Sequence, residues 1–236
     1  MNIALIGYGK MGHEIEAVAK EQGDTIVEIF DIDRTADAAS LKRADVCIEF
    51  SAPDAAVRNI LTAVDAGVDI VVGTTGWYAH LDEIRGRVRN SALLYSANFS
   101  LGVNLYFRIV ARAAELMNNA TDYDAYVHEW HHRQKADSPS GTALRLAEIL
   151  LNRIDRKKSI LRDRSDGKID PASLHVTSTR VGTVPGTHTV AFDSDADQIE
   201  ITHIARNRRG FALGALRAAH WAHGRKGVFT MDDVEL

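Results

Sequence analysis

The sequence predicts an α/β domain built on a Rossmann-type parallel sheet, followed by an α+β domain whose sheet is mainly antiparallel or mixed. Two observations support this fold class. Short apolar runs alternate with helical patterns over residues 2–95, which is typical of parallel strands joined by right-handed crossovers. From residue 174 onward, strand-like runs follow one another without helices between them, and such neighbouring strands pair most easily in antiparallel fashion.

The chain begins with the elements of a dinucleotide-binding unit. An apolar run over residues 2–6 leads into a glycine turn of the form G-x-G-x-x-G, then a helical pattern, then a β-rich run that ends at Asp31. This order is the structural context that the motif requires. The turn contributes six candidate cofactor-binding residues: Gly7, Tyr8, Gly9, Lys10, Met11 and Gly12.

Each glycine of the turn has a physical task. Gly7 permits the tight turn, Gly9 lets the backbone approach a pyrophosphate, and Gly12 lets the helix pack close to the strand. Free N–H groups at the helix start then face the phosphates. Asp31 accepts hydrogen bonds from the ribose hydroxyls and repels a 2′-phosphate, so NADH is favoured over NADPH, although Arg34 nearby softens that preference. The alternative is a glycine-rich turn in another kind of α/β protein.

The alternation continues with strands over residues 44–50, 69–72 and 93–95 and a helix over residues 54–66. In parallel sheets, ligands bind at the carboxyl ends of the strands. The residues that follow those ends are therefore expected to line the nicotinamide side: Ser51, Gly73, Thr74, Thr75, Gly76, Ser96, Ala97, Asn98 and Phe99. Taken alone, the stretch over residues 73–76 is more typical of a plain turn.

A second domain is predicted over residues 102–208, with residues 1–101 and 209–236 forming the first. It is predicted to contain two amphipathic helices, one on each side of a strand. The helix over residues 103–117 is expected to bury Leu105, Ile109, Ala113 and Leu116. The helix over residues 142–154 is expected to bury Ala143, Leu146, Ala147, Leu150 and Ile154.

The remaining elements of the second domain are predicted to be strands, over residues 123–129, 174–179, 187–192 and 198–204. Along the first of these strands, alternate residues share one side: Tyr123, Ala125, Val127 and Glu129. The polar stretch over residues 163–170 is expected to be a surface loop. A final helix over residues 211–221 is expected to return and cover the first sheet.

Side chains able to do chemistry are densest over residues 129–142, between a predicted strand and a predicted helix. Ser140 suits the start of a helix, and Gly141 leaves backbone N–H groups open. A carboxylate bound there meets those N–H groups, the Thr142 hydroxyl and the nearby Lys135. The sequence therefore predicts a site for a small anionic molecule.

Two alternatives concern the histidines of this segment. Residues 128–132 match H-E-x-x-H, the zinc-protease signature. That motif chelates one ion only on a helix, and the preceding residues alternate as in a strand, so no metal is expected. An isolated pair such as His131 and His132 is usually structural, but Lys135 and the anion site beside the pair favour a functional role.

Composition argues against several classes of protein. A formal net charge of −4 provides no basic field, so nucleic acid is not an expected partner. No apolar run is long enough to cross a bilayer, and the first residues lack the features of a secretory signal. No membrane association is expected, and the cytoplasm is the expected location. Cys47, the only cysteine, is expected to be a small buried thiol.

Several motifs together resemble the dihydrodipicolinate reductase family, also called the 4-hydroxy-tetrahydrodipicolinate reductases. They are the glycine turn, the Gly73-Thr74-Thr75-Gly76 stretch, residues 96–104 and residues 129–142. Residues 201–203 and 209–212 extend the resemblance over nearly the whole chain. The glycine turn departs from longer members in being one residue shorter. In addition, Ile32 follows Asp31 where some members have an arginine, which favours NADH.

The resemblance implies an NAD(P)H-dependent oxidoreductase of the diaminopimelate route to lysine. It implies hydride transfer to a ring carbon of a cyclic, unsaturated imine dicarboxylate, giving tetrahydrodipicolinate. It assigns His131 as proton donor or acceptor and Lys135 as proton donor. The substrate contacts that it implies are His132, Gly141 and Thr142. It also implies a homotetramer assembled through the sheet of the second domain.

Two other functions compete with this prediction. One is another two-domain nicotinamide oxidoreductase of amino-acid metabolism, such as an aspartate or homoserine dehydrogenase. That class does not account for His131, His132 and Lys135 ahead of a Ser-Gly-Thr helix start. The other is a non-catalytic NADH-sensing protein, which has no use for a pair of proton-transferring side chains.

Overall fold

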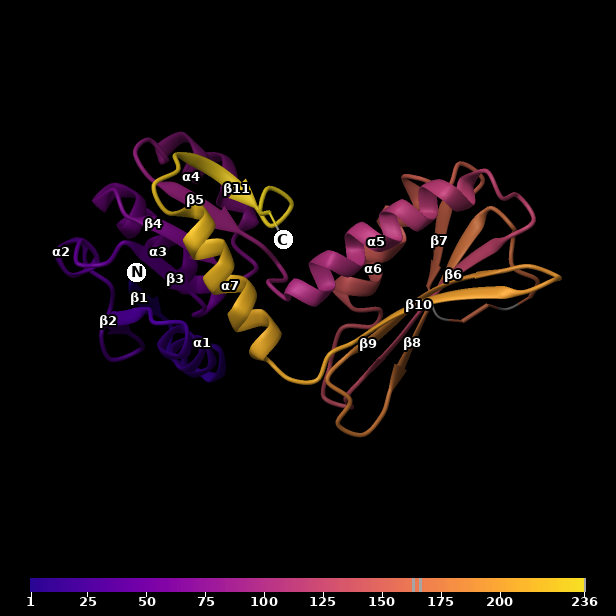
Figure 1. Cartoon of the computed structure of the whole chain (residues 1–236), viewed down its shortest axis with the longest axis horizontal. Coiled ribbons are helices and arrows are strands. Elements are labelled where there is room, and N and C mark those ends of the chain that lie inside the picture. The colour runs from indigo at the N-terminus through magenta and orange to yellow at the C-terminus, as the bar shows by residue number, and fades with distance from the viewer. Residues whose placement is uncertain (163, 166, 236) are drawn as a thin grey trace. The chain divides into compact units, whose positions relative to one another are not determined.

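The computed structural model describes residues 1–162, 164–165 and 167–235. Asp163 and Asp166, which belong to the loop predicted over residues 163–170, lie outside the described residues. The described chain divides into two compact units. The first unit contains residues 1–104 and 208–235, and the second contains Leu105–Asn207 (Figure 1).

The first unit is built on a fully parallel sheet. Within the described residues its strand order is β11-β5-β4-β3-β1-β2. The strands are β1 (Asn2–Ile6), β2 (Thr25–Phe30), β3 (Val46–Glu49), β4 (Asp69–Val72), β5 (Ala92–Tyr95) and β11 (Gly227–Thr230). The predicted parallel sheet is confirmed, and β11 is an addition that the sequence analysis did not predict. Cys47 is buried in β3, as expected.

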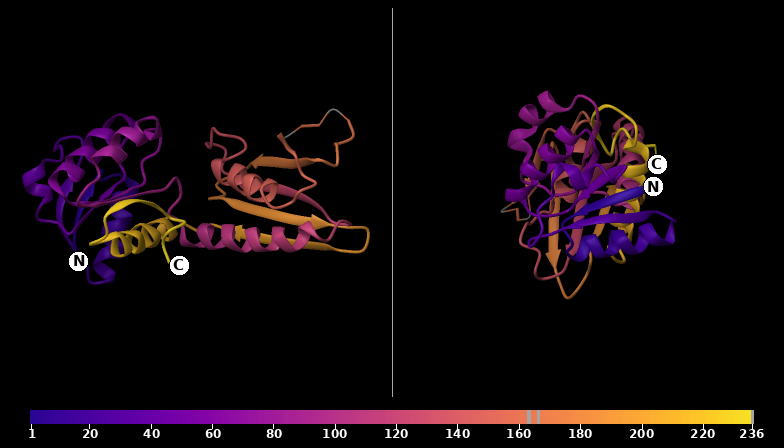
Figure 2. Two further views of the ribbon diagram at one scale, coloured as in Figure 1. Left: turned by 90° about the horizontal axis from the view of Figure 1, so that it is seen from above. Right: turned by 90° about the vertical axis from the view of Figure 1, so that its left-hand side faces the viewer.

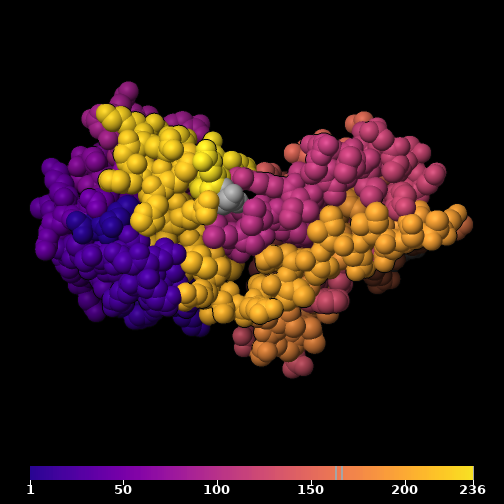
Figure 3. Space-filling model, viewed as in Figure 1, coloured from indigo at the N-terminus to yellow at the C-terminus, as the bar shows by residue number. Residues whose placement is uncertain are grey.

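Helices cover both faces of this sheet, as the left view of Figure 2 shows. They are α1 (Lys10–Glu21), α2 (Ala38–Leu41), α3 (Pro53–Ala66), the 3-10 helix η1 (Tyr78–His80), α4 (Leu81–Arg87) and α7 (Arg209–Ala222). Residues of α1 and α7 share one core cluster, and residues of α3 and α4 share the other. The predicted return of the last helix to the first sheet is confirmed. Figure 3 shows these C-terminal residues on the surface of the N-terminal unit.

The second unit combines two helices with a mixed sheet. Among the described residues the strand order is β10-β9-β6-β8-β7. The elements are α5 (Leu101–Asn118), which begins in the first unit, then β6 (Asp124–His131), α6 (Gly141–Leu151), β7 (Ser159–Arg162), β8 (Ser173–Arg180), β9 (Thr187–Asp193) and β10 (Gln198–Ile204). β9 pairs antiparallel with β10 and β6, whereas β8 pairs parallel with β6 and β7. Antiparallel pairing of β8 with its sequence neighbour β9 was therefore the wrong expectation, because β6 lies between them.

Both helices of the second unit contribute to one apolar core with the sheet. The predicted buried positions of α6 are confirmed, since residues such as Leu146 and Leu150 are fully buried. The predicted core face of α5 is wrong. Ile109 and Leu116 are 54% and 59% exposed, and the side that carries Tyr106 and Val110 is buried instead. None of the helices in the described part of the chain has the length and apolar character to span a bilayer.

Candidate active site

The predicted nucleotide-binding loops all follow carboxyl ends of strands in the first unit. The glycine turn follows β1, Asp31 follows β2, Gly73 follows β4 and Ser96 follows β5. Because the strands are parallel members of one sheet, these loops share one edge of it. The strand order also reverses at β1, which lies between β2 and β3. Such a reversal is where open parallel sheets bind ligands.

The three glycines of the turn differ in their surroundings. Gly7 has a φ of +90°, and a Cβ there would lie 2.3 Å from the carbonyl oxygen of Phe50. A Cβ on Gly12 would lie 2.5 Å from the carbonyl oxygen of Gly7. At Gly9, by contrast, no described atom lies within 4 Å of the Cβ position, and no described side chain caps the start of α1. The turn therefore leaves open space beside the first N–H groups of α1, which fits a bound pyrophosphate.

The other residues of the turn offer different contacts. The Tyr8 hydroxyl donates a hydrogen bond to the Glu16 carboxylate, and its ring packs against His13 with centroids 4.0 Å apart. Met11 packs partly against the core beneath α1. Lys10 is exposed at the first residue of the helix, where its charge can meet a phosphate.

Asp31 is exposed just past the end of β2. Its backbone N–H donates to the carbonyl of Arg34 at 3.1 Å, and the N–H of Arg34 donates back at 3.0 Å. The exposed carboxylate of Asp31 suits the two hydroxyls of a ribose. The guanidinium of Arg34 instead contacts Glu28, with Nη2 at 2.7 Å from Oε2.

The loop after β4 contains both a structural and an exposed threonine. Gly73 runs so close to Phe50 that a Cβ would lie 2.1 Å from the aromatic ring. Thr74 is buried, and its Oγ1 accepts a hydrogen bond from the backbone N–H of Ser51 at 2.8 Å. Thr75 is exposed and available to a ligand.

The loop after β5 is held by its own polar groups. Oγ of Ser96 accepts from the N–H of Asn98 at 3.1 Å and donates to the carbonyl of Asn98 at 2.9 Å. Ala97 is exposed beside them. Phe99 is only 1% exposed, so a nucleotide would contact its backbone rather than its ring.

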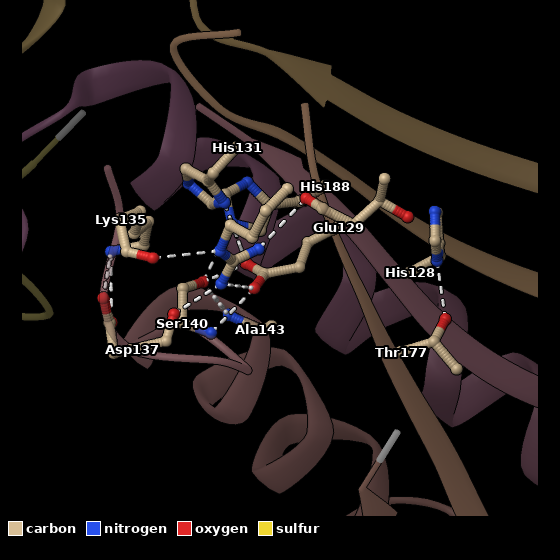
Figure 4. Close-up of polar contacts among 11 residues, drawn as sticks. His128, Glu129, His131, Lys135, Asp137, Ser140, Ala143, Thr177 and His188 are labelled. Atoms are coloured by element: carbon tan, nitrogen blue, oxygen red, sulfur yellow. Dashed lines mark hydrogen bonds and ion pairs between the residues drawn. The ribbon is translucent and has the colours of Figure 1, made fainter. Parts of the chain in front are cut away.

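The second unit contains a buried carboxylate surrounded by polar groups (Figure 4). Glu129 lies on β6 and is fully buried. Its Oε1 accepts hydrogen bonds from the Ser140 backbone N–H at 2.8 Å and from Nη2 of Arg180 at 3.0 Å. Its Oε2 accepts from the Ser140 hydroxyl and lies 3.2 Å from Nδ1 of His131 and 3.3 Å from Nε2 of His188. One carboxylate therefore joins β6, β8 and β9 to the start of α6.

The charges in this cluster follow from its surroundings. Burial acts to raise the pKa of Glu129, but the polar side chains of His131, His188 and Ser140 together hold that pKa well below its usual range. For His188, burial lowers the pKa of the imidazole and outweighs the opposing effect of Glu129. Near neutral pH, Glu129 is an anion and His188 is neutral. A fixed negative charge therefore lies beside the ring of His131.

The two predicted active-site histidines have different environments. The His131 side chain is 9% exposed, and a Cβ on Gly186 would lie only 2.9 Å from its Nε2. Gly186 therefore leaves room for the ring. Nδ1 of His132 is buried and has no hydrogen-bond partner among the described residues. An orphaned polar atom of this kind is suited to bind a ligand.

The predicted anion site contains a carboxylate of the chain itself. Nζ of Lys135 lies 2.8 Å from Oδ1 of Asp137. Burial acts to raise the pKa of Asp137, but Lys135 and the backbone N–H groups of Asp137 and Gly141 lower it below its usual value. The Ser140 hydroxyl accepts from the N–H of Ala143 at 3.2 Å and caps α6, while the Cβ position of Gly141 faces open space and Thr142 is half-buried. An acidic group thus occupies the place predicted for a ligand carboxylate.

The zinc-protease alternative does not fit the structure. His128 and Glu129 lie on a strand, and Nδ1 of His128 is 2.5 Å from Oγ1 of Thr177, away from the cluster (Figure 4). A different trio, Glu129 with His131 and His188, offers ligand atoms within 4.8 Å of one another. The Arg180 guanidinium binds the same carboxylate, and its charge opposes a second cation. The trio therefore suits a hydrogen-bonded network better than a metal site.

Three residues of this network were missing from the predicted site: Glu129, Arg180 and His188. The strand alternation placed Glu129 on the buried side of β6, and a buried acid at a strand end was a signal that could have identified it. Arg180 also donates from Nε to the carbonyl of Lys135 at 3.3 Å and contacts the carbonyl of Asp137. Arg180 and His188 lie some fifty to sixty residues further along the chain, so local spacing gave no sign of them.

Comparisons with known proteins agree over nearly the whole chain. Residues 1–99 match the family model described as "Dihydrodipicolinate reductase, N-terminus", and residues 102–234 match "Dihydrodipicolinate reductase, C-terminus". A 4-hydroxy-tetrahydrodipicolinate reductase of Christiangramia forsetii is 44% identical over 99% of this chain and 97% of that protein. One from Neisseria gonorrhoeae is 38% identical over 83% of this chain and 74% of that protein.

Solved structures show the same fold. A dipicolinate-bound dihydrodipicolinate reductase from Paenisporosarcina sp. TG-14 superposes with a TM-score of 0.80 over 99% of both chains, at 19% identity. An amine dehydrogenase from Mycobacterium smegmatis superposes with a TM-score of 0.64 over 100% of this chain and 96% of that one, at 11% identity. At such identities the likeness concerns the fold alone.

Proposed function

This chain belongs to the dihydrodipicolinate reductase family, and from that membership we propose how its own residues carry out the reduction. As a member it is an NAD(P)H-dependent oxidoreductase. The family reduces a cyclic, unsaturated imine dicarboxylate in the diaminopimelate route to lysine. One observation supports the assignment of roles: the ring of His131 and the start of α6 at Ser140 both contact the buried carboxylate of Glu129, and Arg180 links that carboxylate to the backbone of Lys135.

The first unit holds the nucleotide in this proposal. The N-terminus of α1 and Lys10 bind the pyrophosphate, the open space at Gly9 admits it, and Asp31 binds the adenosine ribose. The loops over residues 73–75 and 96–99 bind the nicotinamide half. When bound, the reduced nicotinamide supplies a hydride ion.

The second unit binds the dicarboxylate. One substrate carboxylate takes the place of Asp137 beside Lys135 and the N–H groups of Gly141 and Thr142. The orphaned Nδ1 of His132 contacts the substrate. Exchanging one carboxylate for another keeps the charge of Lys135 compensated before and after binding.

His131 and Lys135 are the proton-transferring groups in this proposal. The ammonium group of Lys135 donates a proton to the reduced ring, and His131 donates or accepts a proton at its imidazole. Glu129 and Arg180 are positioning residues, which act on the reaction through His131 and Lys135. Glu129 holds a negative charge 3.2 Å from Nδ1 of His131, and Arg180 fixes the loop that carries Lys135.

NADH is the proposed preferred nucleotide, because Asp31 faces the ribose and the nearest arginine is bound to Glu28. The proposed assembly is a homotetramer formed through the second sheet. In support, α5 and α6 share a core with one face of that sheet, and Trp130, which points to the other, is 44% exposed. Sedimentation velocity tests this assembly, and a monomer would contradict it. The cytoplasm remains the predicted location.

The activity is tested directly. The purified chain is mixed with NADH or NADPH and with the substrate generated enzymatically, and the absorbance of the reduced nucleotide is followed. We expect oxidation with both nucleotides and a lower KM for NADH. Absence of oxidation with either nucleotide would contradict the reductase assignment.

A further inference from the structure

Glu28 is a buried acid in an edge strand of the first unit. Its side chain is 5% exposed, although it lies on β2 at the edge of the parallel sheet. The register between β1 and β2 shifts beside it: Ile3 lies opposite Ile26, but Ala4 lies opposite Glu28. Such a bulge turns the following side chains to the other face of the strand. Glu28 therefore shares the face of Ala4, which belongs to the core cluster beneath α3.

Two arginines bind this carboxylate. Nη2 of Arg34 lies 2.7 Å from Oε2 of Glu28, and Nη1 of Arg43 lies 2.6 Å from Oε1. Arg34 is held further by its neighbours. Its Nη1 donates to the carbonyl of Ile29 at 3.3 Å, and its guanidinium carbon lies 4.7 Å from the ring centroid of Phe30.

The position of Arg34 gives this ion pair a consequence for nucleotide choice. The backbone of Arg34 is hydrogen-bonded to Asp31, the proposed ribose ligand. An arginine next to that acid is the group that accommodates the 2′-phosphate in NADP-binding proteins of this fold. If Arg34 turned to a phosphate, the buried carboxylate of Glu28 would keep only one of its two cations, which is costly for a buried charge.

We propose that Glu28 is a specificity-determining residue: by holding Arg34, it keeps this guanidinium from a 2′-phosphate and favours NADH over NADPH. This inference rests on the proposed nucleotide site of the first unit. It assigns the preference to a residue beneath the ribose site, in addition to the direct contact made by Asp31. Arg43 supplies the charge that lets Glu28 remain buried.

The test measures equilibrium binding, without turnover. The dissociation constants of NADH and NADPH are determined by nucleotide fluorescence for the wild type, Glu28→Gln, Arg34→Gln and the double variant, at one fixed ionic strength. In Glu28→Gln the ratio of the NADPH constant to the NADH constant should fall about tenfold, because a released guanidinium gains a charge-assisted bond to phosphate. The double variant should return to the wild-type ratio.

Arg43→Gln is the matched control, because it removes the other guanidinium and leaves Arg34 bound to Glu28. In Arg43→Gln, the ratio of the NADPH dissociation constant to the NADH dissociation constant should equal that of the wild type. Arg34→Gln alone should leave NADPH binding unchanged, and this variant tests the idea even if Glu28→Gln does not fold. An unchanged ratio in folded Glu28→Gln, a gain that persists in the double variant, or weaker NADPH binding in Arg34→Gln would overturn the inference. If the wild type bound neither nucleotide, the proposed function itself would fail, and this inference with it.

Discussion

The backbone N–H of Ser140 donates a 2.8 Å hydrogen bond to Oε1 of Glu129. This bond joins the end of β6 to the residue that caps α6, across the loop that carries Lys135 and Asp137. Bonds to a buried charge are stronger than those between neutral groups. Glu129 therefore fixes the point at which this loop enters α6, and Arg180 holds the loop between.

Glu129→Gln should lower the free energy of unfolding by about 2–3 kcal/mol. A glutamine amide places an NH2 group against donors such as Ser140 and Arg180, so at least one of them loses its acceptor. Urea unfolding measures the loss. Glu148→Gln is the matched control, because this glutamate of α6 is exposed and its ion pair with Arg145, at 3.3 Å, is a surface contact worth about 0.5 kcal/mol. Equal losses in the two variants would contradict the structural role of Glu129.

The same variant should change how stability depends on pH. The folded-state pKa of Glu129 lies below its unfolded value of about 4.3, so its contribution is complete above that pH and is lost as the pH falls through the folded-state pKa. The stability difference between wild type and Glu129→Gln should therefore shrink when urea titrations are run below about pH 5. A difference that grows in acid would contradict the depressed pKa.

His131→Gln and Lys135→Ala should each reduce kcat by about 10²- to 10⁴-fold, the usual contribution of a proton-transferring group. NADH binding should stay intact, because neither side chain belongs to the first unit. Steady-state kinetics and nucleotide fluorescence measure the two effects. Lys158→Ala removes an exposed lysine of the same unit and should leave both unchanged. Normal turnover in both active-site variants would refute the assigned roles.

Asp137→Asn should bind pyridine-2,6-dicarboxylate (dipicolinate) about three- to tenfold more tightly than the wild type, because the ligand no longer displaces a charged carboxylate from Lys135. Isothermal titration calorimetry measures the dissociation constant. Asp195→Asn, at an exposed position of the same unit, serves as control and should bind like the wild type. Weaker binding in Asp137→Asn would mean that Asp137 organises the site instead of competing with the ligand.

Two glycines of the same turn should respond oppositely to alanine. Gly7→Ala should destabilise the chain by about 3 kcal/mol or more, since its Cβ would meet the Phe50 carbonyl at a positive φ. Gly9→Ala has open space and extended backbone, so the melting temperature without nucleotide should barely change. NADH binding should nevertheless weaken more than tenfold, as the new methyl group fills the pyrophosphate path. Thermal melts with and without NADH separate the two, and normal NADH binding by Gly9→Ala would contradict the proposed site.

Local patterns were sufficient where the apolar residues of an element gather on the face that is buried. α6 illustrates this, because its predicted positions Leu146 and Leu150 are buried in the core. α5 was predicted on the wrong face, since apolar residues occur around it and Ile109 is more exposed than Val110. Spacing alone does not decide which of two apolar faces meets a sheet. The position of β6 between β8 and β9 was also hidden, because strand order depends on long-range pairing.

The residues of the candidate site show the same difference between local patterns and long-range contacts. The residues contributed by continuous motifs, such as the glycine turn and residues 131–142, were recognisable from spacing. Arg180 and His188 come from strands distant in sequence, and they meet Glu129 only after the sheet has formed. A contact made by folding leaves no local trace in a single sequence.

The first unit is formed by residues that precede and residues that follow the second unit along the chain, and this order has a consequence during protein synthesis. β11 pairs with β5, and α7 supplies much of one core cluster of the first sheet. When β5 leaves the ribosome, most of the second unit has yet to be translated. Until α7 and β11 follow, β5 presents an unpaired edge, and the sheet face that α7 later covers is protected by α1 alone. Both surfaces favour association with other nascent chains. Translation of the second unit thus sets the time during which these surfaces of the first unit stay uncovered.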